Sequence, residues 1–271
     1  MDLKAYLERI GLTAPEPPSL SALRELHNHH LLSIPFESLS IHIGEKIILD
    51  PALIFNKIVL RRRGGFCYEN NGLFLWVLQE LGYNPKVLSG RVQTRMPGIY
   101  GPTFDHLILT VELEGRRWLC DVGFGEGIRF PFPLEDRWEE EQEGCIFRLR
   151  VDGEEWHLEK RENEGWRSLF KFTLEERRFK DFQGMCEFHQ TSPYSFFVCK
   201  TFCSLQLPRG RVTYMGHRLI KTEFTSGEDR VKNTQILTEE EIPNVLKETF
   251  GIVLNGKLEI KDEDHLLPPT E

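Results

Sequence analysis

The chain has 271 residues and a formal net charge of −8, and 40% of its residues are apolar. That length is enough for one large domain or two to three small ones, and the composition is typical of a globular protein. The negative charge argues against nucleic acid as a partner, because phosphate binding needs a basic surface. The longest purely apolar run, residues 73–78, is far too short to span a membrane. Six cysteines without a C-x-x-C pair, and no signal-peptide pattern, lead us to expect a cytoplasmic protein with reduced thiols.

The first sixty residues predict three helices. An apolar pattern with helical spacing runs from the N-terminus and ends at Gly11. After a proline-rich break, Ser19 or Ser21 can cap a second helix. Asp50 and Pro51 provide a cap and a first-turn proline for a third helix.

A fourth predicted helix begins at Cys67, directly after the glycine turn in RRRGGFCYENNG (61–72), and ends at Gly82. A helix N-terminus presents unpaired N–H groups and the positive end of the helix dipole, and both predict a lowered pKa for this cysteine. The glycines let the chain turn sharply, let a substrate approach closely and could aim N–H groups at an oxyanion. The alternative is a buried structural cysteine behind an ordinary loop.

From about residue 84 the apolar period changes to two, which predicts strands. Residues 104–113 and 116–124 are expected to form a hairpin around Glu114-Gly115, and a further pair of strands brackets Gly216. A capping-box sequence at 238–241 opens another helix, and residues 252–260 are expected to form a last strand. Helices followed by strands and then by a mixed segment favour the α+β class.

Nine histidines could supply the base that a nucleophilic cysteine needs. His27, His29 and His30 share one predicted helix, but no cysteine or carboxylate pattern joins them, so we expect no metal there and partly exposed side chains. His106 lies inside an apolar strand, where an imidazole must be paired. His106 is therefore a candidate base, and a satisfied core histidine is the alternative.

Strand geometry selects the carboxylate that could orient His106. Side chains alternate between faces, so Asp105 points away from its neighbour. With a two-residue turn between Leu113 and Arg116, Asp121 lies on the same face as His106 and diagonal to it. The sequence thus predicts a catalytic set of cysteine, histidine and aspartate, namely Cys67, His106 and Asp121.

These motifs together resemble those of the arylamine N-acetyltransferases, of the prokaryotic type. The resemblance rests on RGGFCYE around Cys67, the strand that begins at His106, DVGFG around Asp121, and two further blocks, IPFESLSIHIG and SLQLPRGRVTYMGHRL. Asn70 departs from the residue that is usual in the family. The resemblance implies an α+β fold with an N-terminal helical bundle, a β-barrel-like middle domain and a C-terminal α/β lid, built around a cysteine-protease-like Cys-His-Asp core. The three domains would span residues 1–83, 84–203 and 204–271.

The resemblance also implies an activity in xenobiotic metabolism. The enzyme would transfer an acetyl group from acetyl-CoA to the nitrogen of arylamines and arylhydrazines, or to the oxygen of arylhydroxylamines. Transfer would follow a ping-pong mechanism through an acetyl-cysteine, with Cys67 as nucleophile, His106 as base and Asp121 as acid. The partners would be small molecules, no metal would be needed, and the chain would be a monomer or a weak homo-oligomer.

The same resemblance assigns further residues to the site. The acetyl-CoA contacts fall on the glycine-containing loop at Gly123, Phe124 and Gly125. The aromatic substrate pocket would comprise Phe36, Val92, Phe124 and Phe202, although composition alone would simply place the phenylalanines in the core. Glu37 and Arg63 match a charged pair that we expect to brace the glycine turn, the alternative being two unrelated surface charges.

Two other classes of protein remain open at this point. A cysteine hydrolase, thioesterase- or protease-like, would use the same three residues, and only the acceptor distinguishes it from a transferase. A non-catalytic binding or scaffold protein would be expected to have lost one of the three residues, and all three are present.

Overall fold

The computed structural model describes residues 1–13, 17–162, 165–224 and 230–264. Its helical segments are α1 (Leu3–Arg9), α2 (Leu20–Ser33), η1 (Ile41–Ile43), α3 (Pro51–Phe55), η2 (Asn56–Leu60), α4 (Cys67–Glu80), η3 (Phe179–Phe182), α5 (Gln183–Thr191), α6 (Phe196–Cys199) and α7 (Ile242–Phe250). Its strands are β1 (Phe36–Glu37), β2 (Pro85–Val92), β3 (His106–Leu113), β4 (Arg116–Cys120), β5 (Phe132–Pro133), β6 (Glu139–Gln142), β7 (Cys145–Asp152), β8 (Glu155–Glu162), β9 (Gly165–Phe172), β10 (Phe202–Leu207), β11 (Gly210–Met215), β12 (Arg218–Phe224) and β13 (Arg230–Ile236).

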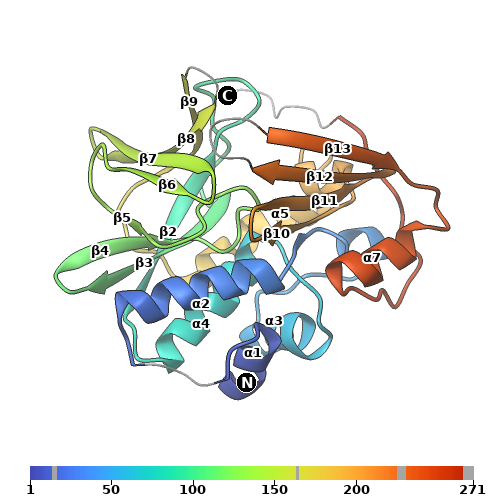
Figure 1. Cartoon of the computed structure of the whole chain (residues 1–271), viewed down its shortest axis with the longest axis horizontal. Coiled ribbons are helices and arrows are strands. Elements are labelled where there is room, and N and C mark those ends of the chain that lie inside the picture. Colours follow the sequence, from blue (N-terminus) through green and yellow to red (C-terminus); the bar gives the residue numbers. More distant parts are fainter. Residues whose placement is uncertain (14–16, 163–164, 225–229, 265–271) are drawn as a thin grey trace.

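The N-terminal helices begin where the sequence predicts. Ser19 caps α2, its hydroxyl oxygen accepting from the Ala22 N–H at 3.1 Å. The Asp50 carboxylate caps α3 in the same way, with Pro51 in the first turn. Helix α4 begins at Cys67. Figure 1 shows that α1 to α4 lie together on one side of the two sheets, so these helices cover one side of both.

The larger sheet has eight antiparallel strands in the order β5-β4-β3-β2-β9-β8-β7-β6, and it curls around its own apolar cluster (Figure 1). Leu113 lies opposite Arg116, so the predicted two-residue turn at Glu114-Gly115 is confirmed. Along β3, Leu107 and Leu109 pack with the helices, whereas Ile108 packs inside the curled sheet. This alternation fixes which face of β3 each chemically active residue occupies.

The smaller sheet has the order β1-β10-β11-β12-β13, and α7 packs against it through Leu246 and Phe250. The predicted pair of strands around Gly216 and the helix that ends before Gly251 are confirmed. The expected strand at 252–260 is wrong. That segment makes single backbone contacts instead, such as Glu259 N–H to His42 O at 2.8 Å. Glu259 also accepts from the hydroxyl of Thr201, just before β10, and β10 already pairs with β1 on one edge and β11 on the other.

The mixed α+β class is confirmed by this arrangement of helices and two sheets. The division into domains at residues 83 and 203 stays a prediction. Within the ranges that the structure describes, no helix is both long enough and apolar enough to cross a membrane.

Candidate active site

Cys67 occupies the first position of α4 and is only 3% exposed. Its Sγ lies 3.9 Å from the carbonyl oxygen of Asp105 and also receives a backbone hydrogen bond from Leu107. These two peptide groups flank His106 in the chain. The thiol therefore lies against the start of β3, where His106 is held.

The expected lowering of the Cys67 pKa is wrong for the thiol taken alone. Burial raises the pKa of Cys67 well above its usual range, and the carboxylates of Asp105 and Asp121 act in the same direction. Only the backbone hydrogen bond from Leu107 opposes them. Because burial is the largest of these effects, forming a thiolate here requires a nearby group that takes the proton.

His106 and Asp121 form a buried pair. The Nε2 atom of His106 lies 2.7 Å from Oδ2 of Asp121, and the two side chains are 2% and 0% exposed. Burial alone would raise the pKa of Asp121, but the charge and hydrogen bond of His106, together with hydrogen bonds from Asn71 and Gly123, lower it. Asp121 is thus held as an anion. Because its oxygen occupies Nε2 of His106, Nδ1 is the nitrogen left for proton transfer.

Asn71 is a residue of the site that the sequence analysis missed. Its Nδ2 donates to Oδ1 of Asp121 at 2.9 Å and to the carbonyl oxygen of Leu107 at 2.7 Å, while its Oδ1 accepts from the Val122 N–H at 2.9 Å. Asn71 follows Cys67 by four residues on α4, and side chains at this spacing lie on the same helix face. The four-residue spacing of Cys67 and Asn71 could have identified Asn71 from the sequence. The helix that presents the thiol also binds the Asp121 carboxylate through Asn71.

Of the three histidines expected to be partly exposed, His27 and His30 are instead fully buried, at 0% exposed, whereas His29 is partly exposed as predicted. The Nε2 atom of His27 accepts from the Asp121 N–H at 3.1 Å, and its Nδ1 lies 2.9 Å from the Arg129 carbonyl oxygen. His30 pairs with the Tyr6 hydroxyl at 2.9 Å. No group of three or more potential metal ligands lies among the described residues.

Asp105 points to the other face of β3, as strand parity predicts. Its Oδ1 lies 3.0 Å from Nε2 of His189 on α5, and its Oδ2 accepts from the Val92 N–H at 3.1 Å. His189 is also 3.2 Å from the Ser195 hydroxyl. Asp105 therefore ties β2 and α5 to the start of β3 and makes no contact with His106 of the kind that Asp121 makes.

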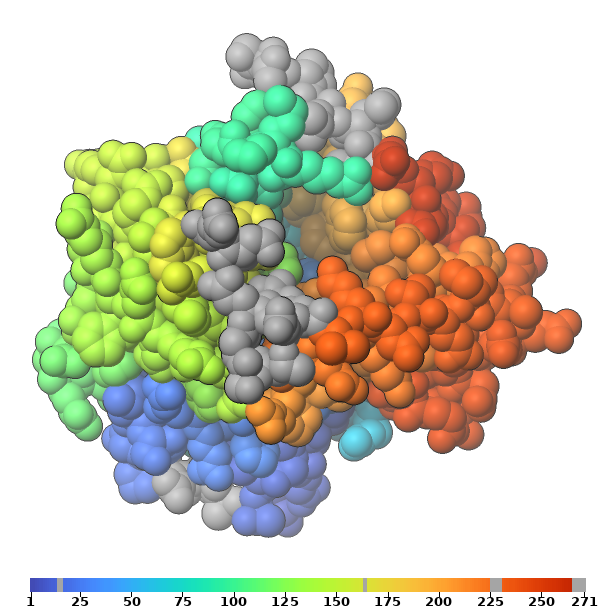
Figure 2. Space-filling view, turned by 45° about the horizontal axis from the view of Figure 1, so that its top comes forward, coloured from blue at the N-terminus to red at the C-terminus, as the bar shows by residue number. Residues whose placement is uncertain are grey.

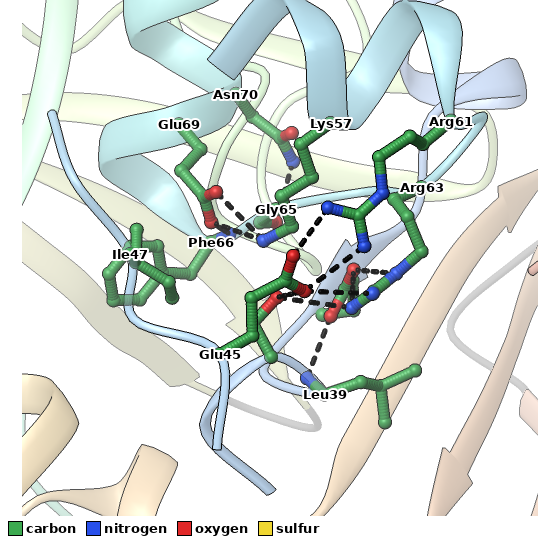
Figure 3. Close-up of polar contacts among 12 residues, drawn as sticks. Leu39, Glu45, Ile47, Lys57, Arg61, Arg63, Gly65, Phe66, Glu69 and Asn70 are labelled. Atoms are coloured by element: carbon green, nitrogen blue, oxygen red, sulfur yellow. Dashed lines mark hydrogen bonds and ion pairs between the residues drawn. The ribbon is translucent and has the colours of Figure 1, made fainter. Parts of the chain in front are cut away.

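The glycine turn before Cys67 rests on a buried charge network, shown in Figure 3. The side chains of Arg63 and Glu37 are both 0% exposed, and Nη2 of Arg63 lies 2.8 Å from Oε1 of Glu37. They are therefore not unrelated surface charges. Arg63 also donates to the Ser40 hydroxyl at 3.2 Å, and Glu37 accepts from the Leu39 N–H at 2.7 Å. Burial would raise the pKa of Glu37, but the charges of Arg63 and Lys57, together with the hydrogen bonds from Leu39 and Arg63, outweigh burial and lower that pKa. The pair joins β1 to the segment that leads into α4.

A second buried pair lies beside the same turn (Figure 3). Lys57 Nζ is 2.7 Å from Oε1 of Glu69, and Oε2 of Glu69 accepts from the Phe66 N–H at 3.2 Å. Asn70, the residue that departs from the resemblance, donates to the Gly65 carbonyl oxygen at 2.9 Å and so stabilises the turn. A Cβ at Gly64 would lie 2.1 Å from the Pro35 carbonyl oxygen, which explains why the turn needs glycine.

Aromatic rings gather beside Phe66, which precedes Cys67 in the chain, and beside His106. Phe36 and Phe202 lie 5.3 Å apart between ring centroids, with Phe197 beside both. On the other side, Phe124 and Phe170 contact the His106 ring at 5.2 and 5.0 Å. In the space-filling view of Figure 2, the surface is hollowed between the turquoise loop that joins β2 to β3 and the gold segment that carries α5 and α6.

The glycines of the 121–127 loop are explained by protein contacts. A Cβ at Gly123 would lie 2.7 Å from Asn71 Nδ2 and 2.8 Å from Cys67 Cα, and one at Gly125 would lie 2.9 Å from the Phe36 ring. The missing side chains therefore let this loop pack against α4 and β1. Val92, at the end of β2, packs with the cluster that contains Phe124. Of the predicted pocket residues, Phe36 thus packs with one apolar cluster and Val92 and Phe124 pack with another, and the loop touches Phe36 at Gly125.

Comparison with known proteins agrees with this architecture. A family model described as N-acetyltransferase matches residues 19–259. The chain is 36% identical to arylamine N-acetyltransferase 2 of Mus musculus, over 97% of this chain and 98% of that protein. It is 37% identical to the pineal gland isozyme NAT-3 of Gallus gallus, another arylamine N-acetyltransferase, over 95% and 96% of the two chains.

Solved structures from bacteria have the same fold. The arylamine N-acetyltransferase of Mycobacterium smegmatis has a TM-score of 0.86 and 32% identity, over 93% of this chain and 92% of that one. The Mycobacterium marinum enzyme, solved in complex with CoA, has a TM-score of 0.84 and 32% identity, over 93% of each chain. A family model over most of the chain, and relatives above 30% identity along nearly all of it, show that this acetyltransferase belongs to the arylamine N-acetyltransferase family.

Proposed function

We propose that this enzyme transfers an acetyl group from acetyl-CoA to the nitrogen of arylamines and arylhydrazines, and to the oxygen of arylhydroxylamines, through an acetyl-Cys67 intermediate. Family membership and the CoA complex of the Mycobacterium marinum relative support the donor. The observation that carries the mechanism is the 2.7 Å contact between His106 and Asp121, at the strand start against which the Cys67 sulfur lies. In this proposal the three residues are the nucleophile, the base and the orienting acid.

In the first half-reaction the buried Cys67 thiol gives its proton to Nδ1 of His106, and the anion of Asp121 stabilises the resulting imidazolium. The sulfur attacks the carbonyl carbon of the acetyl thioester, and the bond from that carbon to the CoA sulfur breaks. The CoA thiolate takes the proton back from His106 and leaves. One thioester replaces another, so the acetyl-enzyme can form without a large loss of free energy.

In the second half-reaction the arylamine nitrogen attacks the acetyl carbon, and His106 removes a proton from that nitrogen. The C–S bond to Cys67 breaks, and the sulfur regains the proton as the amide leaves. An arylamine suits this base because its nitrogen is neutral near pH 7, whereas an alkylamine is mostly protonated. Water competes with the amine for the acetyl group. The rings of Phe36, Phe124 and Phe202 are suited to bind the aromatic acceptor and to exclude water.

The remaining assignments belong to the same proposal. Gly123, Phe124 and Gly125 are proposed to contact acetyl-CoA, and Val92 is proposed to complete the acceptor pocket. Glu37 and Arg63 are proposed to brace the turn that presents Cys67. A cytoplasmic location and a monomer or weak homo-oligomer stay predictions.

Steady-state kinetics test this function. We expect parallel double-reciprocal lines when acetyl-CoA and an arylamine are varied, because CoA leaves before the amine reacts. With acetyl-CoA alone, we expect a burst of about one free CoA per enzyme, read with a thiol reagent and followed by slow hydrolysis. Intersecting lines without a burst would contradict the covalent route, and fast steady-state release of CoA without an amine would instead indicate a hydrolase.

A further inference from the structure

One side chain of α2 holds both ends of the loop that carries the proposed acid and part of the acceptor pocket. The Asp121 N–H donates to Nε2 of His27 at 3.1 Å, and the other ring nitrogen of His27 lies 2.9 Å from the carbonyl oxygen of Arg129. The imidazole is 0% exposed. Between these two anchor points lie Phe124, whose ring contacts that of His106, and Gly125, which packs on Phe36.

The two partners fix the protonation state of this imidazole. A carbonyl oxygen can only accept, so Nδ1 of His27 carries hydrogen, and a backbone N–H can only donate, so Nε2 carries none. His27 is therefore a neutral ring with one donor and one acceptor, both used. Burial lowers its pKa to about 4, which keeps the ring neutral in the range where the enzyme would work.

The Asp121 backbone needs this contact because the strand ladder has already ended. β4 stops at Cys120, and its last pair with β3 joins Leu109 to Cys120. Beyond that point, the Asp121 N–H donates to His27 instead of to a neighbouring strand. The imidazole itself is held edge-on against Phe74 of α4, with ring centroids 5.8 Å apart. Through His27, the loop is thus positioned against α4, the same helix that presents Cys67.

We propose that His27 is a positioning residue for acetyl transfer: through Asp121 it sets the orientation of His106, and through Arg129 it sets the shape of the acceptor loop. The proposal rests on the proposed function, since it assigns His27 a role in that reaction. His27 contacts the Asp121 N–H and the Arg129 carbonyl oxygen, so it would act on the reaction through Asp121 and the loop. The two contacts of His27 can be tested separately, because the one with Asp121 affects the acid and the one with Arg129 affects the acceptor pocket.

Two substitutions divide these contacts. His27→Asn keeps an N–H near the place of Nδ1, within reach of the Arg129 carbonyl, but has no atom at the place of Nε2. His27→Gln reaches the place of Nε2 with an amide oxygen that can accept from Asp121, and leaves the Arg129 carbonyl unpaired. His30→Gln is the matched control, because His30 is equally buried on the same helix and pairs with the Tyr6 hydroxyl.

For His27→Asn we expect the single-turnover rate of acetylation by acetyl-CoA to fall roughly 10- to 100-fold, as when a residue that orients a metal ligand is replaced. For His27→Gln we expect acetylation to be better preserved and the KM for the arylamine to rise several-fold. His30→Gln should lower thermal stability without either kinetic change. If all three variants lose stability and keep wild-type kinetics, His27 is merely structural and the proposal is overturned.

A second measurement does not depend on acetyl transfer. The imidazole nitrogen resonances of His106, followed by NMR as the pH is changed, report its contact with Asp121. We expect His27→Asn to shift this titration and His30→Gln to leave it unchanged. An unshifted titration in His27→Asn would overturn the proposal even if the wild-type enzyme forms its acetyl intermediate. Failure of the wild-type enzyme to form that intermediate would instead contradict the proposed function, with the His106 titration still deciding the role of His27.

Discussion

Replacing Asp121 with asparagine is expected to lower the rate of arylamine acetylation roughly 10³-fold or more while the chain still folds, as found when the aspartate of a serine-protease triad is replaced. The carboxylate now accepts three hydrogen bonds, from His106, Asn71 and Gly123. An asparagine can keep its oxygen toward the last two donors only by turning its NH₂ toward Nε2 of His106. That nitrogen must then accept, so the proton moves to Nδ1 and blocks the atom that should take the proton of Cys67.

The same substitution should change the thiol. Burial raises the Cys67 pKa, so in the proposed mechanism the thiolate forms at neutral pH by transfer of the thiol proton to His106. We therefore expect Asp121→Asn to move the alkylation of Cys67 by iodoacetamide to more alkaline pH than in the wild-type enzyme. Asp105→Asn is the control, since Asp105 faces His189 and is expected to have the milder effect on activity. A larger loss of activity in Asp105→Asn than in Asp121→Asn would show that the wrong carboxylate has been assigned.

Replacing Arg63 with methionine is expected to destabilise the protein by about 3–5 kcal/mol, the cost of removing one partner of a buried ion pair. Arg63 and Glu37 are both fully buried, and the arginine also binds Ser40. Without it, Glu37 keeps the hydrogen bond from the Leu39 N–H but loses the larger of the two positive charges that favour its anion, the other being Lys57. The turn that leads to Cys67 would lose its support at the same time, so activity should fall together with stability.

Urea unfolding at neutral pH measures this loss, and Arg62→Met is the matched control because Arg62 is an exposed neighbour. The double variant Glu37→Gln with Arg63→Met should recover part of the stability, since no unpaired buried charge remains. Equal unfolding free energies for Arg62→Met and Arg63→Met would contradict a bracing role for the pair.

Those parts of the fold that depend on local chemistry could be predicted from the sequence. Caps such as Ser19 and Asp50 satisfy N–H groups within their own helix, and the turn after Leu113 is set by two residues. The pairing of His106 with Asp121 followed from that turn, because strand parity converts a local register into a choice of face. All of these contacts join residues close together in the chain.

Contacts between distant segments could not be predicted in this way. His27 reaches Asp121 across 94 positions, and nothing in its helix pattern distinguishes it from an exposed histidine. Residues 252–260 alternate like a strand, but a strand also needs a free edge, and the pattern of one segment does not reveal whether its neighbour is already paired. The raised Cys67 pKa has the same origin, since burial depends on elements that the helix itself does not contain.

Intact-mass analysis after brief mixing with acetyl-CoA tests most directly whether Cys67 carries the acetyl group. The wild-type enzyme is expected to gain the mass of one acetyl group, located by peptide mapping on the peptide that contains Cys67, and to lose it when an arylamine is added. Cys67→Ala is expected to gain nothing, although the five other cysteines remain. An unmodified wild-type enzyme that still acetylates an arylamine, or an acetyl group located on another residue, would contradict the account.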